Sequence, residues 1–348
     1  MTTTLLLLAT GLLALLSGGE FTVRGAAGLS RAFGIPPFVI GLTIVAFGTS
    51  SPELVVNLIG AYSGESAIAF GNVIGSNLAN IGLVLALSAM LASVHVQGSM
   101  LRREVPLLLL VTFVLFITVI DPWLRDSPAI IDRSDALVLL TLFLLFIYIT
   151  INDVVGPSAE DPLLRAIEGR DGQDPSGPVI DAEEVEDAVV AAEIIEEQQP
   201  QVFRDVALTI AGLVLLIVGG QLTVEHASTL AASAGISSAA IGIGVVAVGT
   251  SLPELITSGI AALRNEPDLA VGNVIGSNLF NTTFVLGISA LAIPLPVPEH
   301  GEWDMLVNLL LVGVLVPFVV TGPRQLARLE GFALLAAYVA YLTWRFNV

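Results

Sequence analysis

Apolar residues occur in long runs along most of this chain, and short polar stretches separate them. Many of these runs approach the length of about 20 residues that a helix needs to cross a bilayer. The pattern predicts ten membrane helices, at residues 3–23, 37–61, 67–93, 104–120, 135–151, 205–226, 238–263, 268–294, 304–321 and 328–346. The predicted fold class is therefore an all-α polytopic membrane protein.

The first apolar run, MTTTLLLLATGLLALLSGG, is similar in length to a signal peptide. It lacks a positively charged N-terminal region and a cleavage-site pattern. It also has a counterpart in the middle of the chain. We therefore expect a retained membrane helix.

One long polar stretch, residues 152–203, interrupts the pattern and carries 14 of the 31 acidic residues. We predict an acidic cytoplasmic loop here. Residues 181–198 could form an exposed helix within it. A solvated linker and a regulatory element both fit this composition.

Two motifs occur twice at one constant spacing. VAFGTSSPEL at position 45 returns as VAVGTSLPEL at 246, and GNVIGSNLAN at 71 returns as GNVIGSNLFN at 272, so both offsets are 201 residues. A constant offset indicates two homologous halves. We place the first five-helix repeat at 1–151 and the second at 204–348, with the motif-bearing regions at about 37–93 and 238–294.

Five helices per half is an odd number, so the second half is predicted to insert upside down relative to the first. The result is an inverted repeat about a pseudo-two-fold axis in the membrane plane. With both termini outside, ten of the 13 arginines fall in inside loops and three fall outside. Because arginine is enriched on the cytoplasmic side, we expect external termini and a cytoplasmic acidic loop.

Glu53 lies about 16 residues after Pro37, which is roughly 24 Å along a helix. Glu53 and Glu254 are therefore predicted near mid-membrane, where an ionised carboxylate is costly without a compensating charge. The chain has no lysine. No arginine lies in the predicted helices that carry the two glutamates, 37–61 and 238–263, or in the next helix after each, 67–93 and 268–294. A proton or a bound metal cation remains as the partner.

Pro52 has no backbone N–H, so the carbonyl one turn earlier, near Gly48, loses its hydrogen-bond donor. Carbonyl oxygens freed in this way at membrane depth can line a polar cavity. Thr49, Ser50 and Ser51 add hydroxyl oxygens. This oxygen-only set suits Ca²⁺ or Na⁺ better than Zn²⁺ or Cu²⁺. The alternative is a proline-kinked helix whose polar side chains only bond to neighbouring helices. Two copies, brought together by the pseudo-two-fold axis, favour the cation site.

The second motif places Ser76 and Asn80 four residues apart, hence on one helix face. Ser277 and Asn281 repeat this spacing. We expect these four side chains to face the two glutamates. Two carboxylates are balanced by one Ca²⁺, by two Na⁺ or by two protons, and mutually exclusive occupancy of one site is the simplest basis for antiport.

GTSSPE and GTSLPE, each followed by GNVIGSN, resemble the α-repeats of the cation/Ca²⁺ antiporter superfamily, the sodium/calcium exchangers. The resemblance implies a Ca²⁺/Na⁺ antiporter in the plasma membrane, without a prosthetic group, and we expect it to act as a monomer. Helices 1 and 6, about 3–33 and 204–234, would slide to alternate access. The resemblance implies these ion ligands: Glu53, Glu254, Thr49, Ser50, Thr250, Ser251, Ala46, Ala247, Ser76, Asn80, Ser277 and Asn281.

Exchangers of this family often carry an aspartate at one of the positions held here by Asn80 and Asn281. The departure leaves the coupling ion open between Na⁺ and H⁺, and a K⁺-dependent antiporter of the same fold is also open. A channel is a further alternative, although two fixed carboxylates would hold a divalent ion too tightly for fast conduction.

Composition narrows the remaining classes. The chain has no cysteine, and its three histidines do not cluster, so thiolate and histidine metal sites are not expected. A net charge of −18 argues against nucleic-acid binding and is typical of high-salt habitats. An intramembrane protease is disfavoured because GTS is not a nucleophile elbow. We do not expect an enzyme.

Overall fold

The structure is a computed structural model, and it is almost entirely helical. It describes residues 2–64, 66–92, 94–95, 98–121, 129–155, 182–234, 247–320 and 325–345.

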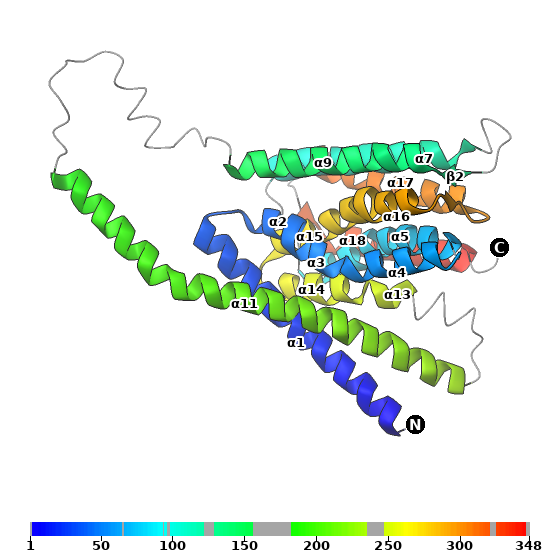
Figure 1. The fold of residues 1–348 in the computed structure, drawn as a ribbon, viewed down its shortest axis with the longest axis horizontal. Helices are drawn as coiled ribbons and strands as arrows, with labels where there is room; N and C mark the ends of the chain where they lie inside the picture. Colours follow the sequence, from blue (N-terminus) through cyan, green and yellow to red (C-terminus); the bar gives the residue numbers. More distant parts are fainter. Residues whose placement is uncertain are drawn as a thin grey trace, which may run out of the picture.

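Two long helices, α1 (Thr2–Phe33) and α11 (Ala182–Ser233), cross along one side of the molecule (Figure 1). Both are longer than the apolar runs that predicted them. α11 is continuous from Ala182, so the helix that residues 181–198 could form is present, and it runs without a break into the apolar part of α11. In the sequence of this extension Val185, Val189 and Ala192 recur every three or four residues, which is the spacing of a helix.

Glycines set the distance between α1 and α11. A Cβ on Gly18 would lie 2.8 Å from the backbone oxygen of Gly212, and one on Gly11 would lie 3.0 Å from that of Gly219. Backbones approach this closely only where small residues line the contact. The contacts are reciprocal under the offset of 201: Gly212 corresponds to Gly11, and Gly219 to Gly18.

The first broken helix consists of four consecutive elements. They are α2 (Pro37–Ile40), the π-helical turn η1 (Gly41–Val45), α3 (Ala46–Thr49) and α4 (Ser51–Tyr62). The axis bends by 41° between Thr49 and Ser51. This is the kink that Pro52 predicts, since proline has no N–H for the carbonyl four residues earlier. In the second half α13 (Ala247–Thr250) and α14 (Leu252–Leu263) follow the same plan.

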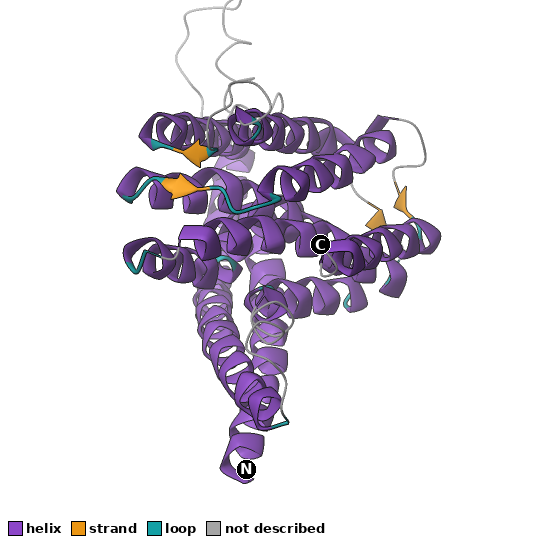
Figure 2. Ribbon diagram, turned by 90° about the vertical axis from the view of Figure 1, so that its right-hand side faces the viewer, coloured by secondary structure: helices purple, strands orange, loops and turns teal. Residues whose placement is uncertain are grey.

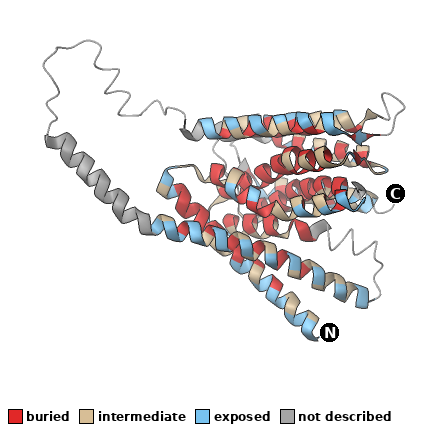
Figure 3. Ribbon diagram, viewed as in Figure 1, coloured by how far each residue is buried: buried red, intermediate tan, exposed pale blue. Residues whose placement is uncertain are grey.

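Two interrupted helices form the centre of the molecule. The first comprises α5 (Ser66–Ala79), η2 (Asn80–Leu85) and α6 (Ala86–Leu91); the second comprises α15 (Pro267–Phe280), η4 (Asn281–Val285) and α16 (Leu286–Ala292). In the most apolar stretch of each interrupted helix, 78% of the residues are buried in the first and 83% in the second, against 33% in α1 and in α11. Figure 3 shows the same contrast between the buried interior and the exposed outer helices.

The remaining helices pack around this centre: α7 (Gly98–Val119), α9 (Arg133–Val155), α17 (Gly301–Val320) and α18 (Arg328–Arg345). Two short antiparallel pairings, which the sequence did not predict, link the halves (Figure 2). β1 (Val94–His95) pairs with β4 (Gln325–Leu326), and β2 (Ile130–Ile131) pairs with β3 (Leu295–Pro296). Each pairing joins one strand from the first half to one from the second.

Five helices in the described part are long and apolar enough to cross a membrane, and the bent pair Pro37–Thr49 with Ser51–Tyr62 makes a sixth candidate. The protein is therefore a multi-pass helical membrane protein. Helices lie at or near all ten predicted spans, and residues 238–246 of the seventh span fall outside the described residues. The number of crossings stays a prediction.

Candidate cation-binding site

The two broken helices place Glu53 and Glu254 in equivalent positions. Ser50 has φ −86° and ψ 5°, and Ser251 has φ −86° and ψ 7°, so both helices break in the same backbone conformation. Each glutamate lies in the first turn of the helix that follows, where the helix dipole favours negative charge. Both side chains are fully buried.

Hydrogen bonds across the two halves bring these segments together. The Ser50 hydroxyl donates to Glu254 Oε1 over 3.1 Å. Thr49 Oγ1 lies 3.4 Å from Ser277 Oγ, and Ser76 Oγ lies 3.5 Å from Thr250 Oγ1. The last two contacts are the same contact under the offset of 201, with the halves exchanged.

The serines of the second motif face the glutamates, as predicted. Ser76 donates to Glu53 Oε1 over 3.4 Å, and Ser277 donates to Glu254 Oε1 over 3.5 Å. One carboxylate oxygen of each glutamate is therefore held by a serine. The Oε2 atom of each glutamate is buried without a hydrogen-bond partner among the described residues.

Asn80 and Asn281 are fully buried, and each begins a π-helical turn. Asn80 Nδ2 donates to Asn278 Oδ1 over 3.0 Å. Within the described ranges, Asn80 Oδ1 and both amide atoms of Asn281 have no partner. π-Helical turns are rare and often occur at functional sites, because they shift the register of the side chains and leave backbone carbonyls without their usual donors.

The Ala46 carbonyl, a predicted backbone ligand, accepts the Ser50 N–H over 3.0 Å and the Thr49 hydroxyl over 3.3 Å, so a cation bound there would replace one of these donors. Ala247 begins α13, and its side chain lies outside the described part. Ser251 is buried, and its hydroxyl has no hydrogen-bond partner among the described residues. Ser51 instead turns away and donates to the Phe47 carbonyl over 2.8 Å.

A chain of hydrogen bonds next to the site, here called the relay, occurs once in each half, and the sequence analysis did not predict it. Asn72 Nδ2 donates to Asn57 Oδ1 over 2.6 Å, and Asn57 Nδ2 donates to the Ala69 carbonyl over 3.0 Å. In the second half Asn273 Nδ2 donates to Ser258 over 2.9 Å, and Ser258 donates to the Ala270 carbonyl over 3.5 Å. Asn57 and Ser258 are 201 residues apart but differ in type, so a search for identical letters does not reveal them.

Among the described residues, no arginine pairs with the two carboxylates of this cluster. The arginine–carboxylate pairs within the described ranges all involve other residues, and the chain has no lysine. No group of three or more His, Cys, Asp or Glu side chains that could hold a metal ion occurs in the described part. Any cation here must therefore combine two carboxylates with hydroxyl, amide and carbonyl oxygens, a set that fits Ca²⁺ and Na⁺.

Comparison with known families decides the relationship. A family model described as sodium/calcium exchanger protein matches residues 3–152 and 205–347. The chain belongs to the sodium/calcium exchanger family. The family resemblance stated from the two motifs is thus confirmed, and the acidic stretch lies between the two matched regions.

Relatives of this exchanger match over nearly its whole length. The putative antiporter CaxA of Alkalimonas amylolytica is 33% identical over 334 residues, 95% of each chain. The sodium/calcium exchanger MaX1 of Methanosarcina acetivorans is 27% identical and covers 100% of this chain and 99% of its own. Among solved structures, the sodium-calcium exchanger NCX_Mj soaked with Na⁺ and Ca²⁺ superposes with a TM-score of 0.78 at 29% identity over 98% of each chain.

In this exchanger the printed contacts join Glu53, Glu254 and five of the predicted hydroxyl ligands across the two halves. No contact in the described part brings Asn80 or Asn281 to a glutamate, and the side chain of Ala247 is not described. Transporters of ions make up the family, so ion antiport across a membrane follows from membership. Which ions this chain carries, and which residues hold them, stay predictions.

Proposed function

We propose that this exchanger moves Ca²⁺ in one direction and Na⁺ in the other across the plasma membrane, by alternating access at one central site. The observation that carries the proposal is the pairing of Glu53 and Glu254, fully buried and joined across the halves by the Ser50–Glu254 hydrogen bond. No protein cation accompanies them in the described part, so the transported ion would supply the missing charge.

The proposed ligands keep the roles that the motifs give them. The carboxylates carry the charge, hydroxyls and amides complete the shell, and backbone carbonyls contribute at the helix breaks. They are Glu53, Glu254, Thr49, Ser50, Thr250, Ser251, Ala46, Ala247, Ser76, Asn80, Ser277 and Asn281. Two carboxylates can neutralise one Ca²⁺ or two Na⁺, so the two ions would exclude one another and exchange.

The proposed architecture has ten membrane helices in two inverted five-helix repeats, 1–151 and 204–348, with the acidic segment 152–203 in the cytoplasm and both termini outside. The reciprocal contacts between the halves support this arrangement. Thr49 contacts Ser277, and the counterparts of these residues in the opposite halves, Thr250 and Ser76, contact each other as well. A two-fold relation between the halves produces such matched contacts.

The test is Ca²⁺ uptake by purified protein in proteoliposomes. Vesicles loaded with Na⁺ and diluted into Na⁺-free buffer should accumulate radiolabelled Ca²⁺, whereas vesicles loaded with choline should not. A proton gradient imposed without Na⁺ forms the comparison. Uptake driven by the proton gradient and indifferent to Na⁺ would reject Na⁺ coupling, and uptake without any counter-ion gradient would indicate a channel.

Ca²⁺/H⁺ exchange is the second candidate, and one observation favours it. Asn80 and Asn281 are amides, so the site carries two carboxylates and lacks the third negative charge that favours binding of additional Na⁺. The same vesicles distinguish the candidates, and an additional series with and without internal K⁺ tests for a K⁺-dependent exchanger.

A further inference from the structure

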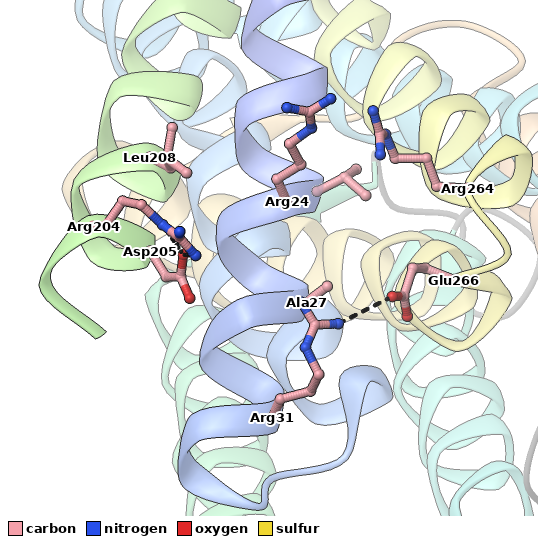
Figure 4. Close-up of a pocket in the computed structure, with 9 residues that line it drawn as sticks. Arg24, Ala27, Arg31, Arg204, Asp205, Leu208, Arg264 and Glu266 are labelled. Carbon is pink, nitrogen blue, oxygen red and sulfur yellow. Dashed lines mark hydrogen bonds and ion pairs between the residues drawn. The ribbon is translucent and has the colours of Figure 1, made fainter. Parts of the chain in front are cut away.

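A pocket lined by arginines lies away from the central site, where α1, α11 and α14 come together (Figure 4). Its volume is about 470 Å³. Four guanidinium groups line it, from Arg24 and Arg31 on α1, Arg204 on α11 and Arg264 at the end of α14. A cluster of four arginines is unusual in a chain that has 13 basic residues in all and a net charge of −18.

Positive charge exceeds negative charge in this pocket. Its lining contains two carboxylates, Asp205 and Glu266, against the four arginines. Asp205 is buried and lies 2.9 Å from Arg204, and Glu266 lies 3.6 Å from Arg31 (Figure 4). Glu20, outside the lining, pairs with both Arg24 and Arg264, which still leaves one positive charge in excess.

The arginines are also open to a ligand. The side chains of Arg24, Arg31 and Arg204 are 56%, 71% and 66% exposed. A guanidinium has five N–H donors in a planar fork, and one carboxylate occupies at most two of them. Donors therefore remain for phosphate oxygens, which this fork fits in a bidentate manner.

The pocket lies at the expected edge of the membrane. Arg24 directly follows the apolar stretch of α1, and Arg204 directly precedes that of α11. Val23, Ala27 and Leu208 give the pocket an apolar lining next to its charged groups. A ligand with an anionic head and an apolar body matches this combination better than a free anion does.

We propose that this pocket binds the phosphate-bearing headgroup of an anionic phospholipid. Arg24, Arg31, Arg204 and Arg264 hold the phosphate, and the first part of the acyl chains lies against the apolar lining. Basic pockets between membrane helices suit such headgroups. Because the arginines come from three helices, a bound lipid links α1 to both α11 and α14.

The experiment measures thermal unfolding of the purified, delipidated full-length protein in detergent, with added phosphatidylglycerol, phosphatidylcholine or inorganic phosphate. A ligand that binds only the folded state raises the melting temperature, and the rise grows with the logarithm of the ligand concentration divided by Kd. Phosphatidylglycerol should raise it, and phosphatidylcholine should not. In the double variant Arg24→Gln/Arg31→Gln, the apparent affinity for phosphatidylglycerol should fall about fivefold for each arginine removed.

Two further variants make the result specific. Arg133→Gln removes one positive charge, against two in the double variant, from an exposed position at the start of α9 outside the pocket lining, and should retain the wild-type response. Arg31→Lys keeps the charge but loses the planar fork, so its response should be intermediate. A cooperative melting transition in each variant shows that it folds.

Three outcomes would overturn the proposal. Equal responses from the double variant and Arg133→Gln would remove the pocket as the binding site. Equal stabilisation by phosphatidylcholine would remove the requirement for an anionic lipid. Stabilisation by inorganic phosphate that matches that of phosphatidylglycerol would assign the pocket to a soluble anion.

Discussion

Glu53 and Glu254 are each fully buried, each accepts a hydrogen bond from a serine, and each keeps one oxygen without a partner among the described residues. Glutamine has the same shape but no charge, so Glu53→Gln and Glu254→Gln should each abolish Ca²⁺ transport. Removing the carboxylate from a buried carboxylate–cation pair weakens cation binding by several kcal/mol, so we expect a loss of transport of at least about a hundredfold. Radiolabelled Ca²⁺ uptake measures it.

Folding is the natural objection to this prediction, and it is tested separately. Neutralising an uncompensated buried charge should leave the ion-free protein at least as stable. Ca²⁺ should raise the melting temperature of the wild type and fail to raise that of either variant. Glu299→Gln, at a side chain that is 91% exposed, serves as the matched control. Normal flux in either central variant would remove the site proposal.

Asn281 is the residue at which the coupling ion should be decided. Its amide is fully buried without a described partner, and it is one of the predicted ligands, so Asn281→Asp adds a negative charge to the predicted site. A third negative charge at contact distance strengthens cation binding by more than 1.4 kcal/mol at an effective dielectric constant near 20, which is about tenfold or more. Na⁺ titration of Ca²⁺ uptake at fixed pH should shift to lower Na⁺. An unchanged titration would place Asn281 outside the Na⁺ site.

At the scale of elements, the close approach between α15 and α2 depends on glycine. A Cβ on Gly272 would collide with the backbone carbonyl of Phe38, which cannot rotate away as a side chain can. Gly272→Ala should therefore destabilise the protein by about 1–3 kcal/mol, as overpacked sites do. Thermal unfolding measures it, and Gly313→Ala in α17, with no described atom within 4 Å, is the control that should be neutral or stabilising.

The start of α9 carries a cap whose contribution should depend on pH. Asp132 Oδ1 accepts the backbone N–H of Ser134 and of Asp135, over 2.7 and 3.1 Å, and the Ser134 hydroxyl over 2.7 Å. These hydrogen bonds lower the pKa of Asp132 below its usual value. Stabilisation is thus present above the unfolded-state pKa of about 3.9 and disappears as the pH falls through the folded-state value.

Asp132→Ala should accordingly lower the melting temperature at neutral pH, and the difference from wild type should shrink below about pH 4. Melting in detergent across this range is the measurement. A difference that stays constant with pH would show that ionisation of the Asp132 carboxyl does not contribute.

Some elements were predictable from the sequence because the repeat constrains them. Once Ser50 and Glu53 recur 201 residues later, a two-fold relation brings each motif against its copy, and the crossed contacts of Ser76 with Thr250 and of Thr49 with Ser277 follow. The π-helical turns at Asn80 and Asn281 were not predictable, because they arise from backbone hydrogen bonding and leave no periodicity in side-chain type. Asn57 was missed because its equivalent is a serine.

At the scale of the whole molecule, the reciprocal glycine contacts of α1 and α11 predict equal sensitivity in both helices. Gly11 meets Gly219, and Gly212 meets Gly18, so a leucine at Gly11 and one at Gly212 should widen the same crossing from its two ends. Gly11→Leu and Gly212→Leu should slow Ca²⁺ uptake to a similar extent, because the expected sliding of these helices needs a contact without large side chains. A strong effect from one substitution and none from the other would contradict the two-fold relation.

The relay behind the site bears on the resting preference of the molecule. In a transporter with two identical inverted halves, the state open to one side is the other state with the halves exchanged, so both would have the same free energy and equal populations. Asn57 in one half and Ser258 in the other break that equality at the same point of the same relay. An imbalance of about 1.4 kcal/mol makes one facing state ten times more populated than the other. The asparagine-to-serine difference, in hydrogen bonds next to the predicted ligands, can thus contribute to a preference of this protein for one facing state over the other.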